Sequence, residues 1–547
     1  MLEINKEFIK NKKSEFEKAG VHIGNVDLDA LVKRTHDNPR WVHFGAGNLF
    51  KAYHAVLSQR LVEGGFCDTG IIAVVPNDFS NMEILYTKHD NLFLQVVMKA
   101  DGSLEKRIIS AVTEFVAADT ENDAAWSNLK EIFAKPSLQM VTISITEKAH
   151  NLFDTNAAPK ASFSAQALKD FEDGLKKPMH AMTKLTALLL ERFNKGAHPI
   201  ALVSTDNFSH NGDKLKAAIV RAAEECEKRS KVSKDFVSYL KDEKKVSFPL
   251  SMIDKITPYS SAAVAKDLQA AGIAGMEITK TERGSSTAAF VNTEEAEYLV
   301  IEDVFPNGRP PLEKVGVYFT TRDKVDMVER MKVCTCLNPL HTALAIYGCL
   351  LGYKTIAEEM QDRDLASLAN KIGYIEGMPV VTDPQIIKPQ SFINDVLTKR
   401  LPNPNIPDTP QRIATDTSQK LSIRFGETIK LYVSRSDLDV KRLVLIPLVL
   451  SAWCRYLLGI DDEGNTFTVS PDPLLESLQE QLKGVTLGKS ETANGKLKSI
   501  LSNATIFGSN LYEAGLGERI ENYFVEMLAG KGAVRKTLQK YVMGVKL

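Results

Sequence analysis

The sequence has few cysteines, almost no net charge and no long apolar run. Six cysteines in 547 residues do not make a disulfide framework, so we expect reduced thiols and a cytoplasmic protein. The 68 basic side chains nearly balance the 69 acidic ones, which argues against binding of nucleic acid or of a membrane surface. No window approaches the roughly eighteen consecutive apolar residues of a membrane span. The charged N-terminus lacks the apolar core of a secretory signal, so we expect neither export nor membrane insertion.

Metal-ligand patterns are scarce as well. Cys334 and Cys336 form a C-x-C pair with His341 nearby, and this is the arrangement that most resembles a zinc site. Side chains two residues apart on a helix point roughly 200° apart, and no second Cys/His cluster offers a matching pair. We therefore expect no metal, and a metalloenzyme built on these residues is the weaker hypothesis.

Length and pattern indicate two domains. A chain of 547 residues is too long for one hydrophobic core. Buried strand-like runs alternate with helical stretches up to residue 322, with a hairpin insertion expected over 91–116, and nearly every later segment has helical spacing. We expect an α/β, Rossmann-like dinucleotide-binding domain with an N-terminal helical extension at 1–322. A predominantly helical, all-α domain at 323–547 would place a substrate cleft between the two.

A glycine-rich turn predicts the cofactor. It follows the strand-like run at 41–44 and reads Gly45-Ala46-Gly47-Asn48-Leu49. A helical stretch and a second buried run at 70–75 come after it. Strand, G-x-G, helix, strand is the dinucleotide-binding pattern, in which the glycines let backbone approach a pyrophosphate at the helix N-terminus. Phe50 replaces the third glycine of that fingerprint, so a plain α/β turn is the alternative interpretation.

Polar side chains follow the predicted strands at their carboxyl ends, where ligands of parallel sheets bind. Asp78 is the candidate for gripping an adenosine ribose, although Asn77 competes with it. The runs after the strands at 140–144 and 199–203 supply Thr146, Glu147, Lys148, Asp206 and Asn207. The alternative for all of them is turn and cap chemistry.

One short segment, 331–341, combines three groups suited to proton removal from an alcohol. Lys332 can act as a general base if its surroundings lower its pKa, Asn338 can stabilise an oxyanion, and His341 can bind a second hydroxyl. The alternative is a helix start, with Asn338 as the N-cap and Pro339 at the first helical position.

Taken together, the motifs resemble the polyol-specific long-chain dehydrogenases. This family includes mannitol 2-dehydrogenase and the reductases of fructuronate and tagaturonate. The resemblance spans roughly residues 40–540. It is carried by 44–52 (G-x-G-N/A-F-x-R-A), 146–148 (T-E-K), 206–212 (C-D-N…N-G), 248–258 (F-P-N-S-M-V-D-R-I-T-P), 301–310 (I-E-D-x-F-x-x-G-R-P), Asn338, His341, 403–404, 408–409 and Arg412.

The resemblance implies an NAD-dependent secondary-alcohol dehydrogenase that needs no zinc, with NADP as an alternative cofactor. It implies that Lys332 is the general base and that Asn207 and Asn338 are the oxyanion donors. Substrate-binding roles fall on Asp254, His341 and Arg412, and His341 also belongs to the catalytic set. The cofactor-binding set is Gly45, Gly47, Asn48, Leu49, Asp78, Thr146, Glu147 and Lys148.

Lys332 departs from the family pattern. It stands one residue further from Asn338 than the family's K-x4-N-x2-H spacing places its lysine. On a continuous helix one extra residue turns the side chain by about 100°. Either the helix bulges there, or Lys332 precedes the helix, or Lys332 is not the base. Pro339 favours the second interpretation, with Lys332 in extended or turn backbone.

The expected substrate is a small sugar alcohol or sugar acid. The run Asp408-Thr409 with Arg412 favours a hexitol and ketohexose pair such as mannitol and fructose, whereas the G-x-G-N opening favours a hexuronate. A guanidinium also suits a carboxylate, which it binds bidentately. A nucleotide-binding protein without catalytic activity is a further alternative, because the position of Lys332 is shifted.

Overall fold

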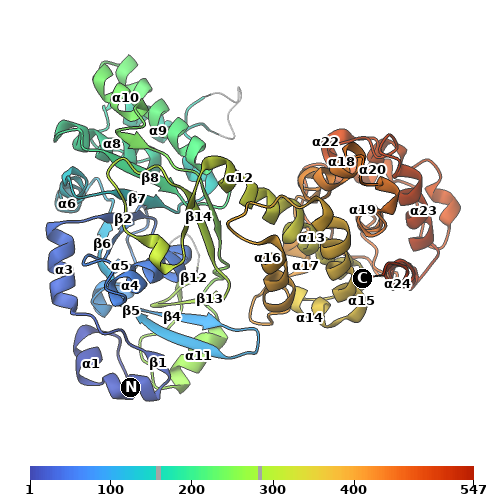
Figure 1. The fold of residues 1–547 in the computed structure, drawn as a ribbon, viewed down its shortest axis with the longest axis horizontal. Helices are drawn as coiled ribbons and strands as arrows, with labels where there is room; N and C mark the ends of the chain where they lie inside the picture. The colour runs from blue at the N-terminus through green and yellow to red at the C-terminus, as the bar shows by residue number, and fades with distance from the viewer. Residues whose placement is uncertain (155–161, 281–285, 547) are drawn as a thin grey trace. The chain divides into compact units, whose positions relative to one another are not determined.

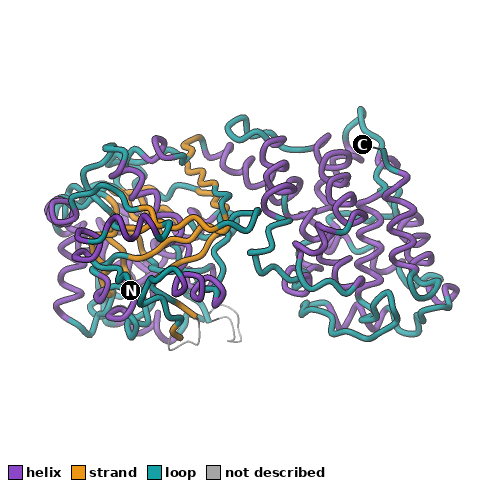
Figure 2. Tube along the Cα trace, turned by 90° about the horizontal axis from the view of Figure 1, so that it is seen from below, coloured by secondary structure: helices purple, strands orange, loops and turns teal. Residues whose placement is uncertain are grey.

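The structure is a computed structural model that describes residues 1–154, 162–280 and 286–546. It divides into two compact units (Figure 1). The first comprises Met1–Lys99 and Ser103–Val325, and the second comprises Ala100–Gly102 and Asp326–Leu547. Strands gather in the first unit, whereas the second consists of helices and loops (Figure 2).

A six-stranded sheet forms the centre of the first unit. All its strands are parallel and lie in the order β6-β3-β2-β7-β8-β9. They are β2 (Trp41–Phe44), β3 (Ile71–Val75), β6 (Val112–Ala117), β7 (Met140–Ile143), β8 (Ile200–Ser204) and β9 (Val246–Ser247). The chain order reverses between β2 and β7, and ligands of doubly wound sheets bind beyond the strand ends at such a reversal.

Both faces of this sheet are buried, which explains the continuous apolar runs in the sequence. Successive side chains on a strand point to opposite faces, so Val42 and Phe44 pack into one core and Trp41 into the other. The first core is completed by α6 (Asp123–Ala134), α7 (Ala165–Glu172), α8 (Ala181–Asn194), α9 (Asn211–Lys228) and α10 (Lys234–Lys241). The second includes η1 (Phe50–His54) and α4 (Ala55–Glu63). The predicted Rossmann-like α/β topology is therefore confirmed.

Smaller sheets complete the first unit. The predicted hairpin exists as β4 and β5, which turn at residues 101–102, but β6 belongs to the main sheet and not to the insertion. The further strands are β1 (Val21–His22), β4 (Phe93–Met98), β5 (Leu104–Ile109), β10 (Ser251–Asp254), β11 (Thr279–Lys280), β12 (Ser286–Thr287), β13 (Phe290–Glu294), β14 (Tyr298–Glu302) and β15 (Tyr318–Thr320). The remaining helices are α1 (Lys6–Asn11), α2 (Lys13–Lys18), α3 (Leu28–Asp37), α5 (Met82–Leu85) and α11 (Ala262–Ala270), with short turns η2 (Thr87–His89), η3 (Glu147–His150) and η4 (Leu312–Val315).

The second unit is helical, as predicted, and none of its described residues belongs to a named strand. Its core forms around α13 (Asn338–Leu351) and α19 (Leu445–Tyr456), which pack against each other and are almost wholly buried. Other helices are α12 (Arg322–Met331), α14 (Ile356–Gln361), α15 (Arg363–Lys371), α16 (Pro389–Asp395), α17 (Pro410–Ile413), α18 (Glu427–Ser434), α20 (Leu475–Gln481), α21 (Lys498–Leu501), α22 (Ala504–Phe507), α23 (Gly517–Met527) and α24 (Ala533–Gly544). Four π-helical segments interrupt them: η5 (Lys332–Cys336), η6 (Ile372–Gly377), η8 (Val396–Arg400) and η10 (Ser422–Gly426).

A single helix among the described residues, Arg322–Leu351, has the length and hydropathy of a membrane span. Within its most apolar window, 83% is buried inside the protein. A core helix of a folded domain passes the same test, so the helix is weak support for membrane insertion.

Glu376 anchors the start of α19 from inside the core. Its carboxylate oxygens accept hydrogen bonds from the backbone N–H groups of Val444 (2.7 Å), Leu445 (2.7 Å) and Ile446 (2.8 Å). These N–H groups have no acceptor within their own helix, so a buried side chain satisfies them. Burial raises the pKa of Glu376 from 4.5 to about 7.

We expect Glu376→Gln to flatten the pH dependence of stability. The folded state holds the Glu376 proton more tightly than the unfolded state, so this contribution is complete below pH 4.5 and is lost as pH rises through about 7. Between pH 5 and pH 8 the unfolding free energy of the wild type should fall by roughly 2 kcal/mol more than that of the variant. Urea unfolding at the two pH values measures this difference, and parallel pH profiles would contradict it.

Candidate active site

The glycine turn after β2 borders open space at the start of a helix. Gly45 has φ +124°, and a Cβ on it would lie 2.1 Å from the Ser144 carbonyl oxygen, so only glycine fits beside β7. A Cβ on Gly47 would meet nothing within 4 Å. The helix begins at Asn48, whose Nδ2 donates to the Pro258 carbonyl oxygen (3.0 Å). Backbone N–H groups at this helix start therefore face a space that an anion can occupy.

Phe50 occupies the place of the third glycine by turning into the core. Its ring is fully buried and stacks on His43 at 4.6 Å, while Leu49 packs at the edge of the same core. The helix is π-helical from Phe50 to His54. A bulky side chain at this position is thus compatible with the dinucleotide-binding topology.

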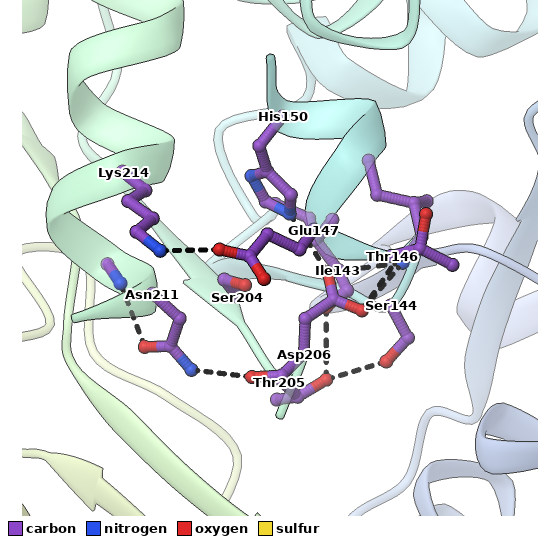
Figure 3. Close-up of polar contacts among 12 residues, drawn as sticks. Ile143, Ser144, Thr146, Glu147, His150, Ser204, Thr205, Asp206, Asn211 and Lys214 are labelled. Atoms are coloured by element: carbon purple, nitrogen blue, oxygen red, sulfur yellow. Dashed lines mark hydrogen bonds and ion pairs between the residues drawn. The ribbon is translucent and has the colours of Figure 1, made fainter. Parts of the chain in front are cut away.

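Asp206 ties together the loops that follow β7 and β8 (Figure 3). Its buried carboxylate accepts hydrogen bonds from the backbone N–H groups of Ile145 (3.0 Å) and Thr146 (3.0 Å) and contacts His150 Nε2 (2.9 Å). Asn211 Nδ2 donates to the Asp206 carbonyl oxygen (3.0 Å), and the Ser144 and Thr205 hydroxyls are 2.8 Å apart. These contacts fix the backbone of both loops at the switch point.

Thr146 shows how tightly this loop is held. It has φ +89°, a conformation that is unfavourable for a β-branched residue. The Asp206 carboxylate, which accepts its N–H, holds it there. Glu147 pairs with Lys214 at the surface (2.6 Å), and Lys148 is exposed. Strain of this kind gathers at ligand-binding loops, where side chains must be presented in one orientation.

Two predicted residues lie at neighbouring strand ends. Asn207 directly follows Asp206 and is exposed. Asp78, beyond β3, has φ +58° and accepts a hydrogen bond from the Ser80 hydroxyl (2.7 Å). Asp254 ends β10, where it lies opposite Tyr298 of β14, and its side chain is buried. The structure thus places Asn207 and Asp78 at the carboxyl edge of the main sheet, and Asp254 on the adjacent small sheet.

We expect Asp206→Asn to weaken both stability and cofactor binding. The amide would present N–H groups to backbone N–H donors, which leaves a buried donor unsatisfied and costs about 1–3 kcal/mol. Loosening of Thr146 should raise the Kd for NAD, by about tenfold for each 1.4 kcal/mol lost. Urea unfolding and a fluorescence titration with NADH measure the two effects. Asp267→Asn, at an exposed site on α11, is the matched control, and an unchanged Kd in Asp206→Asn would contradict the role of the clamp.

Lys332 lies inside a helix, and the expectation that it precedes the helix is wrong. The helix runs through Arg322–Leu351, and Lys332–Cys336 forms a π-helical segment within it. A π-bulge takes up one extra residue, so it offsets the rotation that the longer spacing to Asn338 would otherwise cause. The Lys332 side chain is buried. The first of the three interpretations, a bulged helix, is correct.

Asn338 is not a helix cap. It is the first residue of α13, Leu337 precedes it, and no side chain caps this end. The amide of Asn338 therefore has no structural task of the kind that the helix-start interpretation gave it. Burial raises the pKa of the Cys334 thiol to about 11 and that of Cys336 to about 12, which disfavours the thiolates that zinc requires. No group of metal ligands occurs within residues 1–154, 162–280 and 286–546.

His341 stands among three arginines. Burial, together with the guanidinium groups of Arg424, Arg400 and Arg412, lowers the pKa of His341 to about 3. His341 Nε2 lies 3.4 Å from Asp408 Oδ2, but a neutral imidazole forms no ion pair at that distance. Asp408 instead pairs with Arg412 one helical turn away. The second unit thus presents a neutral imidazole in a strongly positive environment.

Two family models match the chain in succession. The mannitol dehydrogenase Rossmann domain matches residues 39–314, and the mannitol dehydrogenase C-terminal domain matches residues 324–528. The chain belongs to the mannitol dehydrogenase family. As a member of this family it is an NAD-dependent oxidoreductase, and the predicted family, fold, enzyme class and cofactor are confirmed.

Full-length relatives of this mannitol dehydrogenase family member carry different substrate names. The D-mannonate oxidoreductase of Thermotoga maritima is 50% identical over 99% of both chains. The mannitol 2-dehydrogenase of Emericella nidulans is 29% identical over 92% of both chains. Among solved structures, Pseudomonas fluorescens mannitol 2-dehydrogenase in complex with NAD and D-mannitol has a TM-score of 0.68 at 24% identity, covering 99% of this chain and 100% of its own. A D-sorbitol dehydrogenase has a TM-score of 0.75 at 22% identity, with coverages of 96% and 98%.

The residues of this family member fit a dinucleotide. The open backbone at Gly47 and the helix start at Asn48 suit the pyrophosphate, and Asp78 follows the second strand, where a ribose would lie. When bound, the nicotinamide exchanges a hydride with the substrate carbon.

Sequence reasoning missed two features of the site. The Asp206 carboxylate acts through backbone N–H groups distant in sequence, which no motif displays. Arg424 lies in the run Leu421-Ser-Ile-Arg424-Phe425, where a lone basic residue among apolar neighbours was the available signal.

Proposed function

We propose that the protein interconverts D-mannonate and D-fructuronate with NAD as the cofactor. The 50% identity to a D-mannonate oxidoreductase along the whole chain supports a hexonate substrate over mannitol and fructose. The expectation of a hexitol and ketohexose pair is thus less well supported than its hexuronate alternative. D-Altronate and D-tagaturonate are the epimeric pair within the same class.

The observation that carries this proposal is the positive surroundings of His341. Arg400, Arg412 and Arg424 all lie close enough to depress its pKa. A hexitol is uncharged and offers nothing to neutralise a group of guanidiniums, whereas a hexonate carries a carboxylate that guanidinium binds bidentately. The electrostatics therefore favour a sugar acid.

We propose that Lys332 takes the hydroxyl proton when the alcohol carbon loses its hydride. A positioned base of this kind contributes roughly 10²–10⁴-fold. The amides of Asn207 and Asn338 donate to the oxygen as it gains negative charge, and backbone fixed at Asp206 and in the π-bulge holds these groups in place. In the reverse direction Lys332 returns the proton to the new hydroxyl.

His341 binds the substrate as a neutral imidazole. Because its pKa lies at about 3, it stays uncharged at every pH at which the enzyme works. It can then donate to one hydroxyl and accept from another, while Asp254 and Arg412 bind further polar groups. Its neutrality also leaves the proton-transfer role to Lys332.

For the cofactor we propose Gly45, Gly47, Asn48 and Leu49 as the pyrophosphate turn and Asp78 as the ribose ligand. Thr146, Glu147 and Lys148 complete the set at the end of β7. Six free and buried cysteines support a cytoplasmic location.

The test is oxidation of sugar acids by the purified enzyme in EDTA. D-Mannonate with NAD should yield NADH with a higher kcat/KM than D-altronate or D-mannitol. A preference for D-mannitol would refute the hexonate assignment, and a preference for D-altronate would correct it to the epimer. Loss of activity in EDTA would restore the metalloenzyme hypothesis.

A further inference from the structure

Arg424 is held rigidly beside the segment that contains Lys332, Asn338 and His341. It lies in η10, which packs against η5. A Cβ on Gly426 would lie 2.1 Å from the Phe507 carbonyl oxygen, so η10 fits closely against its neighbour. The guanidinium is therefore positioned by packed backbone rather than by a surface loop.

A short hydrogen-bonded chain joins Arg424 to Asn338. Arg424 Nη1 donates to the Thr342 hydroxyl (2.5 Å), which in turn donates to the Asn338 carbonyl oxygen (2.8 Å). Thr342 follows His341 directly on α13. The guanidinium is thus fixed next to the residues for which we propose contact with the substrate.

Arg424 has no acidic partner in the described part of the chain. Ion pairs satisfy other arginines of this unit, namely Arg330 with Glu427, Arg412 with Asp408, Arg435 with Asp437 and Arg535 with Asp362. Arg424 forms only the Thr342 bond there, and its Nε and Nη2 are not enclosed among the buried unsatisfied atoms, so a ligand can reach them. Burial alone lowers its pKa to about 10, without an opposing carboxylate. A partly buried cation in this state is stabilised by an anion.

We propose that Arg424 binds the substrate carboxylate and so selects sugar acids over neutral ketohexoses. The inference rests on the proposed hexonate function and goes beyond it by assigning the carboxylate to one residue. Arg412, to which the sequence pointed, is already neutralised by Asp408. The free Nε and Nη2 of Arg424 form the planar fork that matches two carboxylate oxygens.

The test is the substrate preference of Arg424→Gln. Its kcat/KM for D-fructuronate should fall about 10- to 150-fold through a higher KM, as loss of a charged hydrogen bond predicts. Its kcat/KM for D-fructose should stay within about threefold. Arg424→Lys keeps the charge but loses the fork, so it should fall between the two, and it also serves if the glutamine variant folds poorly.

Two controls separate the possible outcomes. Arg435→Gln removes a surface arginine paired with Asp437 and should change neither substrate. If the wild type reduces D-fructuronate and Arg424→Gln keeps the wild-type preference, the assignment to Arg424 is overturned while the hexonate function stands. If Arg412→Gln alone lowers the preference, the carboxylate binds Arg412 instead. If the wild type does not reduce D-fructuronate, both proposals are overturned.

Discussion

Replacing Lys332 with alanine is expected to lower kcat by roughly 10²–10⁴-fold, the contribution of a positioned general base. The Kd for NADH should stay near the wild-type value, because the proposed cofactor residues lie at the glycine turn of the first unit. Stopped-flow or steady-state reduction of D-fructuronate gives kcat, and a fluorescence titration gives the Kd.

Lys483→Ala is the matched control for this experiment. Lys483 is 74% exposed and pairs with Glu480 on the surface, so its loss should leave kcat unchanged. A Lys332→Ala enzyme that keeps most of its kcat would show that the proton leaves through another group. If the wild type itself binds NADH but turns over no sugar, the alternative of a non-catalytic nucleotide-binding protein would hold.

Asn338→Ala is expected to lower kcat by roughly 10²–10³-fold, the measured cost of losing one oxyanion donor. Because Asn338 is not an N-cap, the substitution should change the Tm little. Reduction kinetics together with a thermal melt distinguish the two contributions.

Asn503→Ala tests the opposite combination. Asn503 caps α22 by accepting a hydrogen bond from the Thr505 N–H (2.9 Å), so its loss should cost about 0.5–2 kcal/mol of stability and leave kcat unchanged. If Asn338→Ala lost stability as Asn503→Ala does and retained its kcat, Asn338 would be a structural residue after all.

The architecture of the first unit could be predicted because it rests on local patterns. Apolar runs such as Trp41–Phe44 and Ile71–Val75 are buried on both faces and fixed by the glycine turn between them. Sheet order follows from this topology once the dinucleotide pattern is seen. The extent of the hairpin insertion could not, because β6 pairs with β3, far from its neighbours in sequence.

The segment around Lys332 shows where sequence reasoning failed. Pro339 is a valid signal for a helix start, but the preceding residues continue the helix through a π-helical segment. Apolar periodicity does not distinguish a wider turn from an ordinary one, since the bulge depends on packing against η6 and η10. The residues were therefore selected correctly by the resemblance, whereas their backbone was not.

Arg424 failed to appear for a different reason. Its environment is built by α13 and η10, which are distant in sequence. The absence of an acidic partner is a property of three-dimensional packing, so no spacing rule reveals it. Asp408 and Arg412, by contrast, are one helical turn apart and pair locally.

The measurement that tests the central claim most directly is the ratio of kcat/KM for D-fructuronate to that for D-fructose. Both substrates are reduced by the same preparation with NADH in EDTA. A carboxylate bound by an otherwise unpaired guanidinium predicts a preference of roughly 10- to 150-fold for D-fructuronate. Equal values, or a preference for D-fructose, would contradict the assignment as a hexuronate reductase.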